Sequence, residues 1–302
     1  MRQPARLGQV PIQERGGIRS QLDSHRSPQV ARTGGETTMR LLDSHVHLDR
    51  MAGEDILRMA WGGVEAAVVP TPHLMSGVFY PKTLLELWEK TLDYIVKYAA
   101  SMGIDVYVGL AVPFYGITAE GYDECLNKLP EYLKEPRVVC IGEIGLDTGN
   151  AHEEYLLRAQ LAIAKAHNLP IIVHSPTPRE PQTPEVTTRI IDVLKEEDYP
   201  LEKAVLDHSG KNTIPARLKS GCVTGLSICY DKLTAEEASE IVRGYPEYRD
   251  KIIIGSELGY GGAGHLSVVK AAWAMKMDGM PVEEIERVTW VNPRRLFGLP
   301  VA

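Results

Sequence analysis

The sequence lacks any long hydrophobic run. None of its apolar segments reaches the roughly 18 consecutive residues that a membrane-spanning helix requires. The first residues also lack the shorter apolar stretch of a secretory signal. We therefore expect a protein that neither crosses a membrane nor is exported.

Cysteine is scarce and scattered. The four cysteines are Cys125, Cys140, Cys222 and Cys229, and no two of them form a CxxC pair. This spacing excludes a zinc knuckle and a disulfide framework. Isolated thiols in a chain of 302 residues are typical of a reducing cytoplasm, where they serve as small, buried, apolar side chains.

Positive charge is also in short supply. The 33 Lys and Arg residues face 40 Asp and Glu residues, which gives a net charge of −7, and no basic stripe runs along the sequence. Tight binding of duplex DNA depends on neutralising phosphates, so nucleic acid is not a favoured partner. It is not excluded, because divalent metal ions can neutralise phosphates in place of side chains.

The first 38 residues differ in composition from the rest. They contain six arginines, no lysine and three acidic residues, and they are rich in Gly, Gln and Ser. Met39 then directly precedes the first apolar run. We interpret residues 1–38 as a disordered tail or upstream extension and residues 39–302 as a single domain. A functional basic arm is the alternative for the first segment.

From residue 40 onward, short apolar runs alternate with amphipathic stretches. Eight runs predict β-strands, at residues 40–45, 64–70, 104–112, 137–142, 169–174, 203–208, 221–227 and 251–256. The other stretches predict helices, at residues 53–61, 83–101, 118–134, 152–167, 184–196, 212–219, 234–244, 265–278 and 281–297. Eight such parallel βαβ units in about 260 residues fit a (β/α)8 TIM barrel. A doubly wound open sheet is the runner-up, but it would usually bring a GxGxxG loop after the first strand, which is missing here.

A His-x-His pair closes the first predicted strand. Residues two apart share one face of a strand, so Asp43, His45 and His47 are predicted to point the same way. The two imidazoles can then converge on one cation. Hydrogen-bonded core histidines are the alternative for this motif taken alone.

Further metal-ligand residues follow other predicted strands, namely Glu143, His174, His208 and Glu257. In a closed parallel barrel the carboxyl ends of the strands share one rim, which is where such barrels keep their active sites. A single histidine or glutamate at a strand end is more often structural. A buried group of them without a cation, however, would cost on the order of several kcal/mol in desolvation.

The charges of this group suit two divalent ions. Four neutral imidazoles and two carboxylates sum to −2, against +4 for the metals. The remaining positive charge suits a bridging hydroxide and an anionic or carbonyl-bearing substrate. Because the ligands are mixed histidine and carboxylate, we expect zinc, manganese or iron, with cobalt and magnesium as further candidates.

A family resemblance rests on four segments: DSHVHLD at 43–49, IGEIGLD at 141–147, PIIVHS at 170–175 and NPRRLFGL at 292–299. Together they resemble TatD-type hydrolases, which belong to the metal-dependent amidohydrolase superfamily. The resemblance spans residues 40–299. The segments Asp207-His208 and GSELGY at 255–260 are more similar to the archaeal branch of predicted TIM-barrel hydrolases than to the DNases.

The resemblance implies a role for each site residue. His45 and His47 would hold the first metal, His174 and His208 the second, and Glu143 would bridge both. The family's last site residue is an aspartate that binds the first metal and accepts the proton of the attacking water. This chain has Glu257 there, one methylene longer, so its roles as ligand and as proton acceptor are both open.

Three further side chains are candidate substrate-binding residues, because they follow strands two, five and eight: His73, Ser175 and His265. A surface position is the alternative for His73. Asp147 is predicted to cap the following helix rather than to bind metal.

The predicted function is hydrolysis of a small polar ester, amide or phosphoester by a metal-activated water, with Glu257 and Glu143 as the catalytic residues. A TatD-like metal-dependent DNase or phosphodiesterase is the first alternative. A metal-binding barrel without catalysis is the second. The expected partner is a small molecule, and the sequence names neither that substrate nor an oligomeric state.

Overall fold

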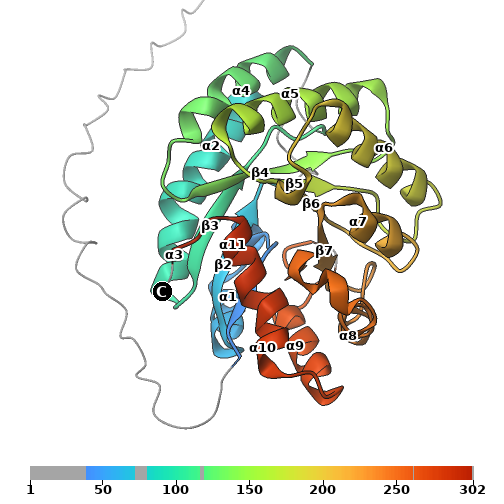
Figure 1. The fold of residues 1–302 in the computed structure, drawn as a ribbon. Coiled ribbons are helices and arrows are strands. Elements are labelled where there is room, and N and C mark those ends of the chain that lie inside the picture. The colour runs from blue at the N-terminus through green and yellow to red at the C-terminus, as the bar shows by residue number, and fades with distance from the viewer. Residues whose placement is uncertain (1–38, 72–79, 116–118, 261, 301–302) are drawn as a thin grey trace, which may run out of the picture. The chain divides into compact units, whose positions relative to one another are not determined.

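The structure is a computed structural model that describes residues 39–71, 80–115, 119–260 and 262–300. Eight parallel β-strands form its centre. They are β1 (Leu41–Asp43), β2 (Val64–Pro70), β3 (Asp105–Leu110), β4 (Val138–Gly145), β5 (Ile171–His174), β6 (Ala204–Leu206), β7 (Val223–Ser227) and β8 (Ile252–Gly255). Each strand pairs with the next one in the chain, which confirms the predicted barrel order (Figure 1). All eight predicted strands are present, with ends shifted by three residues or fewer.

Helices connect the strands and cover the outside of the sheet (Figure 1). They are α1 (Gly53–Trp61), α2 (Pro81–Lys90), α3 (Val96–Ser101), α4 (Ala119–Tyr132), α5 (Ala151–His167), α6 (Thr183–Glu196), α7 (Ile214–Ser220), α8 (Ala235–Gly244), α9 (Ser267–Met277), α10 (Val282–Glu286) and α11 (Asn292–Leu296). Two π-helical turns, η2 (Thr91–Ile95) and η5 (Arg287–Val291), join α2 to α3 and α10 to α11. The predicted helices 83–101 and 281–297 are therefore continuous but not uniformly α-helical. Three short 3-10 turns complete the connections: η1 (Leu48–Arg50), η3 (Leu201–Lys203) and η4 (Pro246–Lys251).

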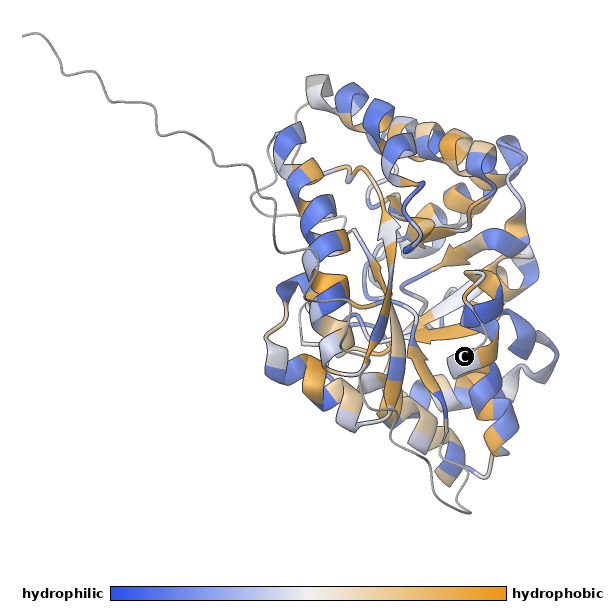
Figure 2. Ribbon diagram, turned by 90° about the vertical axis from the view of Figure 1, so that its left-hand side faces the viewer, coloured by the Kyte–Doolittle hydropathy of each residue, from blue (hydrophilic) through white to orange (hydrophobic). Residues whose placement is uncertain are grey.

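The two faces of the strands belong to different apolar clusters, as the alternation of side chains along a strand requires. The outward residues join the helices in one large cluster. The inward residues fill the barrel together with side chains from the C-terminal segment, and the set comprises Leu42, Ala66, Val68, Tyr107, Cys140, Ile172, Val205, Val223, Ile253, Trp290, Phe297 and Leu299. Figure 2 shows the strands mostly in hydrophobic colours and the surrounding helices with hydrophilic outer sides.

The barrel closes between β8 and β1 through the residues that follow these strands. The backbone N–H of Ser44 donates to the carbonyl of Ile254 at 3.1 Å, and that of Glu257 donates to the carbonyl of His45 at 3.0 Å. The N–H of His47 donates to the carbonyl of Leu258 at 2.7 Å. The seam of the barrel is therefore built from the same segments that carry the predicted metal ligands.

Two predictions from composition can be compared with the structure. All four cysteines are buried and unpaired, as expected for small apolar side chains. No helix in the described part of the chain is both long and apolar enough to span a bilayer. The predictions for residues 1–38 and for His73 lie outside the described residues.

Candidate metal centre

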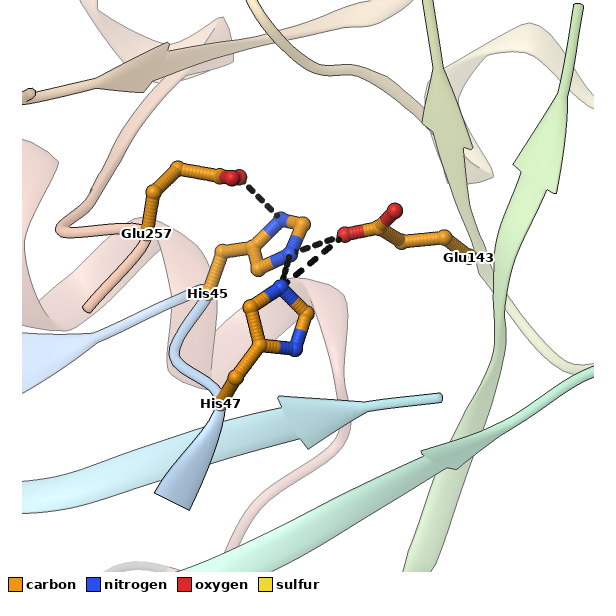
Figure 3. Close-up of side chains that lie close together, drawn as sticks. All are labelled: His45, His47, Glu143 and Glu257. Carbon is orange, nitrogen blue, oxygen red and sulfur yellow. Dashed lines mark hydrogen bonds and ion pairs between the residues drawn. The ribbon is translucent and has the colours of Figure 1, made fainter. Parts of the chain in front are cut away.

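Four of the predicted ligands lie together at the carboxyl ends of the strands. Each of His45, His47, Glu143 and Glu257 offers one ligand atom, and these atoms lie within 4.8 Å of one another. All four side chains are buried, with exposures of 1–2%. Figure 3 shows the two imidazoles between Glu143 on one side and Glu257 on the other.

Asp43 does not join this group, although the sequence predicts that it shares a face with the two histidines. Strand β1 ends at Asp43, so the alternation of faces does not continue beyond it. The carboxylate instead accepts the backbone N–H groups of His45 at 3.2 Å and Ser256 at 2.9 Å. Burial raises the pKa of Asp43 to about 6 despite these bonds. Asp43 therefore fixes the ends of β1 and β8 next to each other.

Three ligand atoms form a small triangle, and two of its three edges have the length that one metal ion needs. His45 Nε2 lies 3.3 Å from His47 Nε2, which lies 3.4 Å from Glu143 Oε1. His45 Nε2 and Glu143 Oε1 are also in direct contact. Ligand atoms about 2.1 Å from a tetrahedral ion lie about 3.4 Å from each other. Two of the separations therefore suit one transition-metal ion, whereas His45 and Glu143 have to move apart to share it.

The second ring nitrogen of His45 faces Asp207. Its Nδ1 lies 2.5 Å from Asp207 Oδ2 and 3.1 Å from Glu257 Oε1. A proton on Nδ1 donated to Asp207 leaves Nε2 free for a metal, which is how carboxylates orient metal-binding histidines. The other carboxylate oxygen of Asp207 accepts the Ser227 hydroxyl at 2.6 Å and the N–H of His208 at 2.9 Å.

The other two predicted histidines lie beside this group and face each other. The rings of His174 and His208 are perpendicular, with centroids 4.6 Å apart. His174 Nδ1 lies 3.8 Å from Glu143 Oε2. His208 donates from Nδ1 to the carbonyl of Ser175 at 2.8 Å, and its Nε2 lies 2.9 Å from Glu257 Oε1. One oxygen of Glu143 thus faces the His45–His47 pair and the other faces His174.

The backbone is strained at two of the site residues. His208 and Glu257 adopt φ values of 58° and 57°, in the left-handed region that side chains other than glycine rarely occupy. Such strain persists only where surrounding contacts fix it, and it is concentrated at functional sites. It turns the chain sharply after β6 and β8 and directs both side chains toward the centre.

The site concentrates negative charge around His45. Burial would lower the pKa of His45, but the carboxylates of Glu257, Glu143 and Asp207 raise it well above its usual value. Burial would raise the pKa of Glu257, but the cationic forms of His45, His208 and Lys232 hold it well below the usual range. A buried group that attracts a proton this strongly also suits a divalent cation in its place.

Lys232 is a buried neighbour of the site that the sequence analysis does not single out. Its Nζ lies 3.4 Å from Glu257 Oε2, and its side chain is 1% exposed. It lies in the loop after β7. That strand ends at Ser227 and offers no metal ligand. The only signal in the sequence is a lysine placed shortly after a strand end, and lysines are common in loops.

Ser175 hydrogen-bonds to neighbouring protein groups, and its contact with substrate stays a prediction. Its hydroxyl donates to the carbonyl of Asp207 at 3.0 Å and accepts from the Arg217 guanidinium at 2.5 Å. The residue is 2% exposed. Ser175 therefore connects the ends of β5 and β6 and positions His208 through its carbonyl group.

The structure corrects the predicted helix start at residue 265 and the predicted cap at Asp147, whereas the contact of His265 with substrate stays a prediction. Helix α9 begins at Ser267, so His265 precedes it, and its Nδ1 lies 4.0 Å from Asp55 Oδ1. Asn150 caps α5 in place of Asp147 by accepting two backbone N–H groups. Asp147 instead lies between the Tyr115 hydroxyl, which donates to it at 3.0 Å, and His174 Nε2, at 3.4 Å.

A closed parallel barrel with buried histidines and carboxylates at its carboxyl rim defines a class, the metal-dependent hydrolases of the amidohydrolase type. Comparison with known proteins places the chain more narrowly. The model of the TatD related DNase family matches residues 42–298. The chain therefore belongs to this family and is an enzyme, a metal-dependent hydrolase, as the resemblance implied.

Relatives and solved structures agree with this assignment. The chain is 32% identical over 262 residues to MJ0761 of Methanocaldococcus jannaschii, an uncharacterized metal-dependent hydrolase, covering 86% of this chain and 100% of the relative. It is 29% identical over 146 residues to YjjV of Escherichia coli, an uncharacterized metal-dependent hydrolase, and the match covers 45% of this chain and 51% of the relative.

Among solved structures, a TatD-like protein from Archaeoglobus fulgidus matches with a TM-score of 0.69 at 21% identity, over 85% of this chain and 100% of the other. The phosphotriesterase homology protein of Escherichia coli, complexed with phosphate, matches with a TM-score of 0.65 at 12% identity, over 86% and 99%. At these identities the structural matches establish the fold.

Proposed function

We propose that the chain hydrolyses a small polar ester, amide or phosphoester at a centre of two divalent ions. His45 and His47 would hold the first ion, His174 and His208 would hold the second, and Glu143 would be a ligand shared by both. The observation that carries the proposal is the division of the Glu143 carboxylate. Its Oε1 lies 3.4 Å from His47 and its Oε2 lies 3.8 Å from His174.

When bound, the ions would supply an activated water near neutral pH and polarise the substrate oxygen, and mixed nitrogen and oxygen ligands favour zinc, manganese or iron. The protein residues do the rest. Asp207 holds the His45 ring in the orientation that presents Nε2. Glu257 Oε1 lies 3.1 Å from His45 Nδ1 and 2.9 Å from His208 Nε2, so it contacts one histidine of each proposed pair. We assign Glu257 the role of proton acceptor and keep His73 and His265 as candidate contacts to the substrate.

A phosphodiester or DNA substrate is the second candidate, because the matching family is described by its DNases. The net charge of −7 argues against extended contact with a nucleic acid backbone. Cleavage of single-stranded DNA in the presence of magnesium would favour this candidate. Turnover of small esters or amides, with no cleavage of DNA, would favour the first.

The test of the proposed centre is the metal content per chain, measured by elemental analysis on protein purified without chelators or affinity metals. We expect about two transition-metal ions per chain, because the site offers two groups of ligands. His45→Ala should lose at least half of them. His167→Ala is the matched control, since His167 is exposed at the end of α5. An absence of metal, with no uptake of zinc or manganese on titration, would contradict the proposal.

A further inference from the structure

Lys232 is a buried cation to which the proposed function assigns no role. Its ammonium lies 3.4 Å from Glu257 Oε2, 3.6 Å from Cys229 Sγ and 3.9 Å from Asp231 Oδ1. It also lies 5.6 Å from the centre of the Tyr260 ring, within the range of a cation–π contact. Glu257 is the most deeply buried of the acidic groups around it, with 2% exposure.

The loop that carries Lys232 is fixed to the barrel on both sides. The N–H of Ile228 donates to the carbonyl of Gly255 at 2.8 Å, which joins the start of the loop to β8. The N–H of Leu233 donates back to the carbonyl of Ser227 at 3.3 Å, and that of Lys232 donates to the carbonyl of Cys229 at 3.1 Å. Thr234 then caps α8 through a reciprocal capping box. The ammonium is therefore held in place by the backbone and not only by its own contacts.

The two oxygens of Glu257 face different partners. Oε1 lies 2.9 Å from His208 Nε2 and 3.1 Å from His45 Nδ1, whereas Oε2 faces Lys232. A glutamate side chain has three rotatable bonds. Without a restraint on one carboxylate oxygen, the two oxygens could exchange places or both turn toward a cation.

We propose that Lys232 is a positioning residue that holds Oε2 of Glu257, so that Oε1 alone faces His45 and His208. This inference rests on the proposed function, because it concerns the part that Glu257 takes in the same centre. When Lys232 is replaced by Met, both oxygens become available to a metal ion, and a like charge beside the ion is lost. Metal binding then becomes tighter, which is the opposite of what loss of a supporting residue usually causes.

The first experiment uses the metal-free protein and does not depend on any metal. Thermal unfolding is measured in EDTA for the wild type, Lys232→Met, Glu257→Gln and the double variant. Removal of one partner leaves the other buried and uncompensated, so the double variant should unfold at a higher temperature than the sum of the single effects predicts. Additive effects of the two changes would overturn the proposed pairing.

The second experiment measures zinc affinity by competition with a chromophoric chelator. Lys232→Met should bind zinc about tenfold more tightly than the wild type, whereas Lys232→Arg, which keeps the charge and the donors, should stay within about threefold. In the Glu257→Asp background, where the carboxylate is one methylene shorter, Lys232→Met should have a clearly smaller effect, because only the loss of the like charge remains. Lys82→Met is the matched control, because Lys82 forms a surface pair with Glu86 at 3.6 Å and is 85% exposed.

Each outcome of the zinc titration has a definite meaning. An unchanged or weaker affinity in Lys232→Met would contradict the inference. An equal change in the wild-type and Glu257→Asp backgrounds would also contradict it, since Lys232 would then act through its charge alone. A wild type that binds no zinc or manganese would count against the proposed function, and the unfolding experiment would then decide the pairing by itself.

Discussion

Asp207 shows how strongly the centre depends on a side chain that faces the ligands from behind. It accepts from the His45 ring, from the Ser227 hydroxyl and from the N–H of His208, and it is 3% exposed. Burial would raise the pKa of Asp207, but interactions with His45 and His208 lower it, so the carboxylate is anionic. Asp207 thus orients the His45 ring directly, and it holds the backbone that carries His208.

The variant Asp207→Asn tests this arrangement. Asparagine keeps the shape but can turn an NH2 group toward the His45 Nδ1–H, and the ring then loses its acceptor. We expect metal affinity to fall about 10–100-fold with the fold retained. The measurement is a competitive zinc titration together with circular dichroism. Asp123→Asn on the surface of α4 is the control, and equal affinities in the two variants would contradict the role given to Asp207.

Individual ligands were predictable, but their supporting contacts were not. His45, His174 and Glu257 stand out in the sequence because each follows an apolar run that reads as a strand. Lys232 and the partners of Asp147 depend on the path of loops, which no periodic pattern encodes. The left-handed backbone at His208 and Glu257 was equally invisible, because Glu rarely adopts it and the enrichment of His there is too weak to mark one position.

At the scale of elements, glycines allow the strand ends to approach the ligands. Gly145 ends β4 and pairs with His174 of β5, and an added Cβ would lie 2.1 Å from the carbonyl oxygen of His174. A Cβ on Gly255 would lie 2.8 Å from that of His45. The strands can carry ligands at this spacing only because side chains are missing at the points of closest approach.

A pair of glycine substitutions tests this reading. Gly145→Ala should lower the free energy of unfolding by about 2–4 kcal/mol, because its φ of 153° and the contact with His174 both disfavour a side chain. Gly244→Ala, at the end of α8 with open space around it, should raise it by about 0.4–1 kcal/mol. Urea denaturation measures both. Equal effects of the two substitutions would show that the approach at Gly145 is not tight.

The elements themselves followed from the sequence with small errors at their ends. The alternation of apolar runs and amphipathic stretches gave the number and order of strands, because each period reflects a buried face. The prediction that Asp147 caps the helix after β4 is wrong, and the reason is clear. Asn150 competes for the same helix and lies directly before its first residue, where its side-chain oxygen reaches two N–H groups.

At the scale of the whole molecule, metal binding should stabilise the entire chain, because the proposed ligands lie in or shortly after β1, β4, β5, β6 and β8. Ligand held at about 1,000 times its dissociation constant contributes about 4 kcal/mol. We expect removal of metal by EDTA to lower the melting temperature by about 5–15 °C, and readdition of zinc or manganese to restore it. His45→Ala should show little response to EDTA. A wild type whose melting temperature ignores the chelator would argue against metal binding at this site.

The seam between β8 and β1 also sets the order in which the site can be completed. The carboxylate of Asp43 accepts the N–H of Ser256 across 213 positions of sequence, and Glu257 bonds to the backbone of His45 beside it. During synthesis the His-x-His pair leaves the ribosome early, but its closing partners follow only after nearly the whole barrel has been translated. The nascent chain thus holds half of a metal centre for most of its production. It can acquire the complete centre only when its last strand has been made, so catalytic competence coincides with a finished barrel.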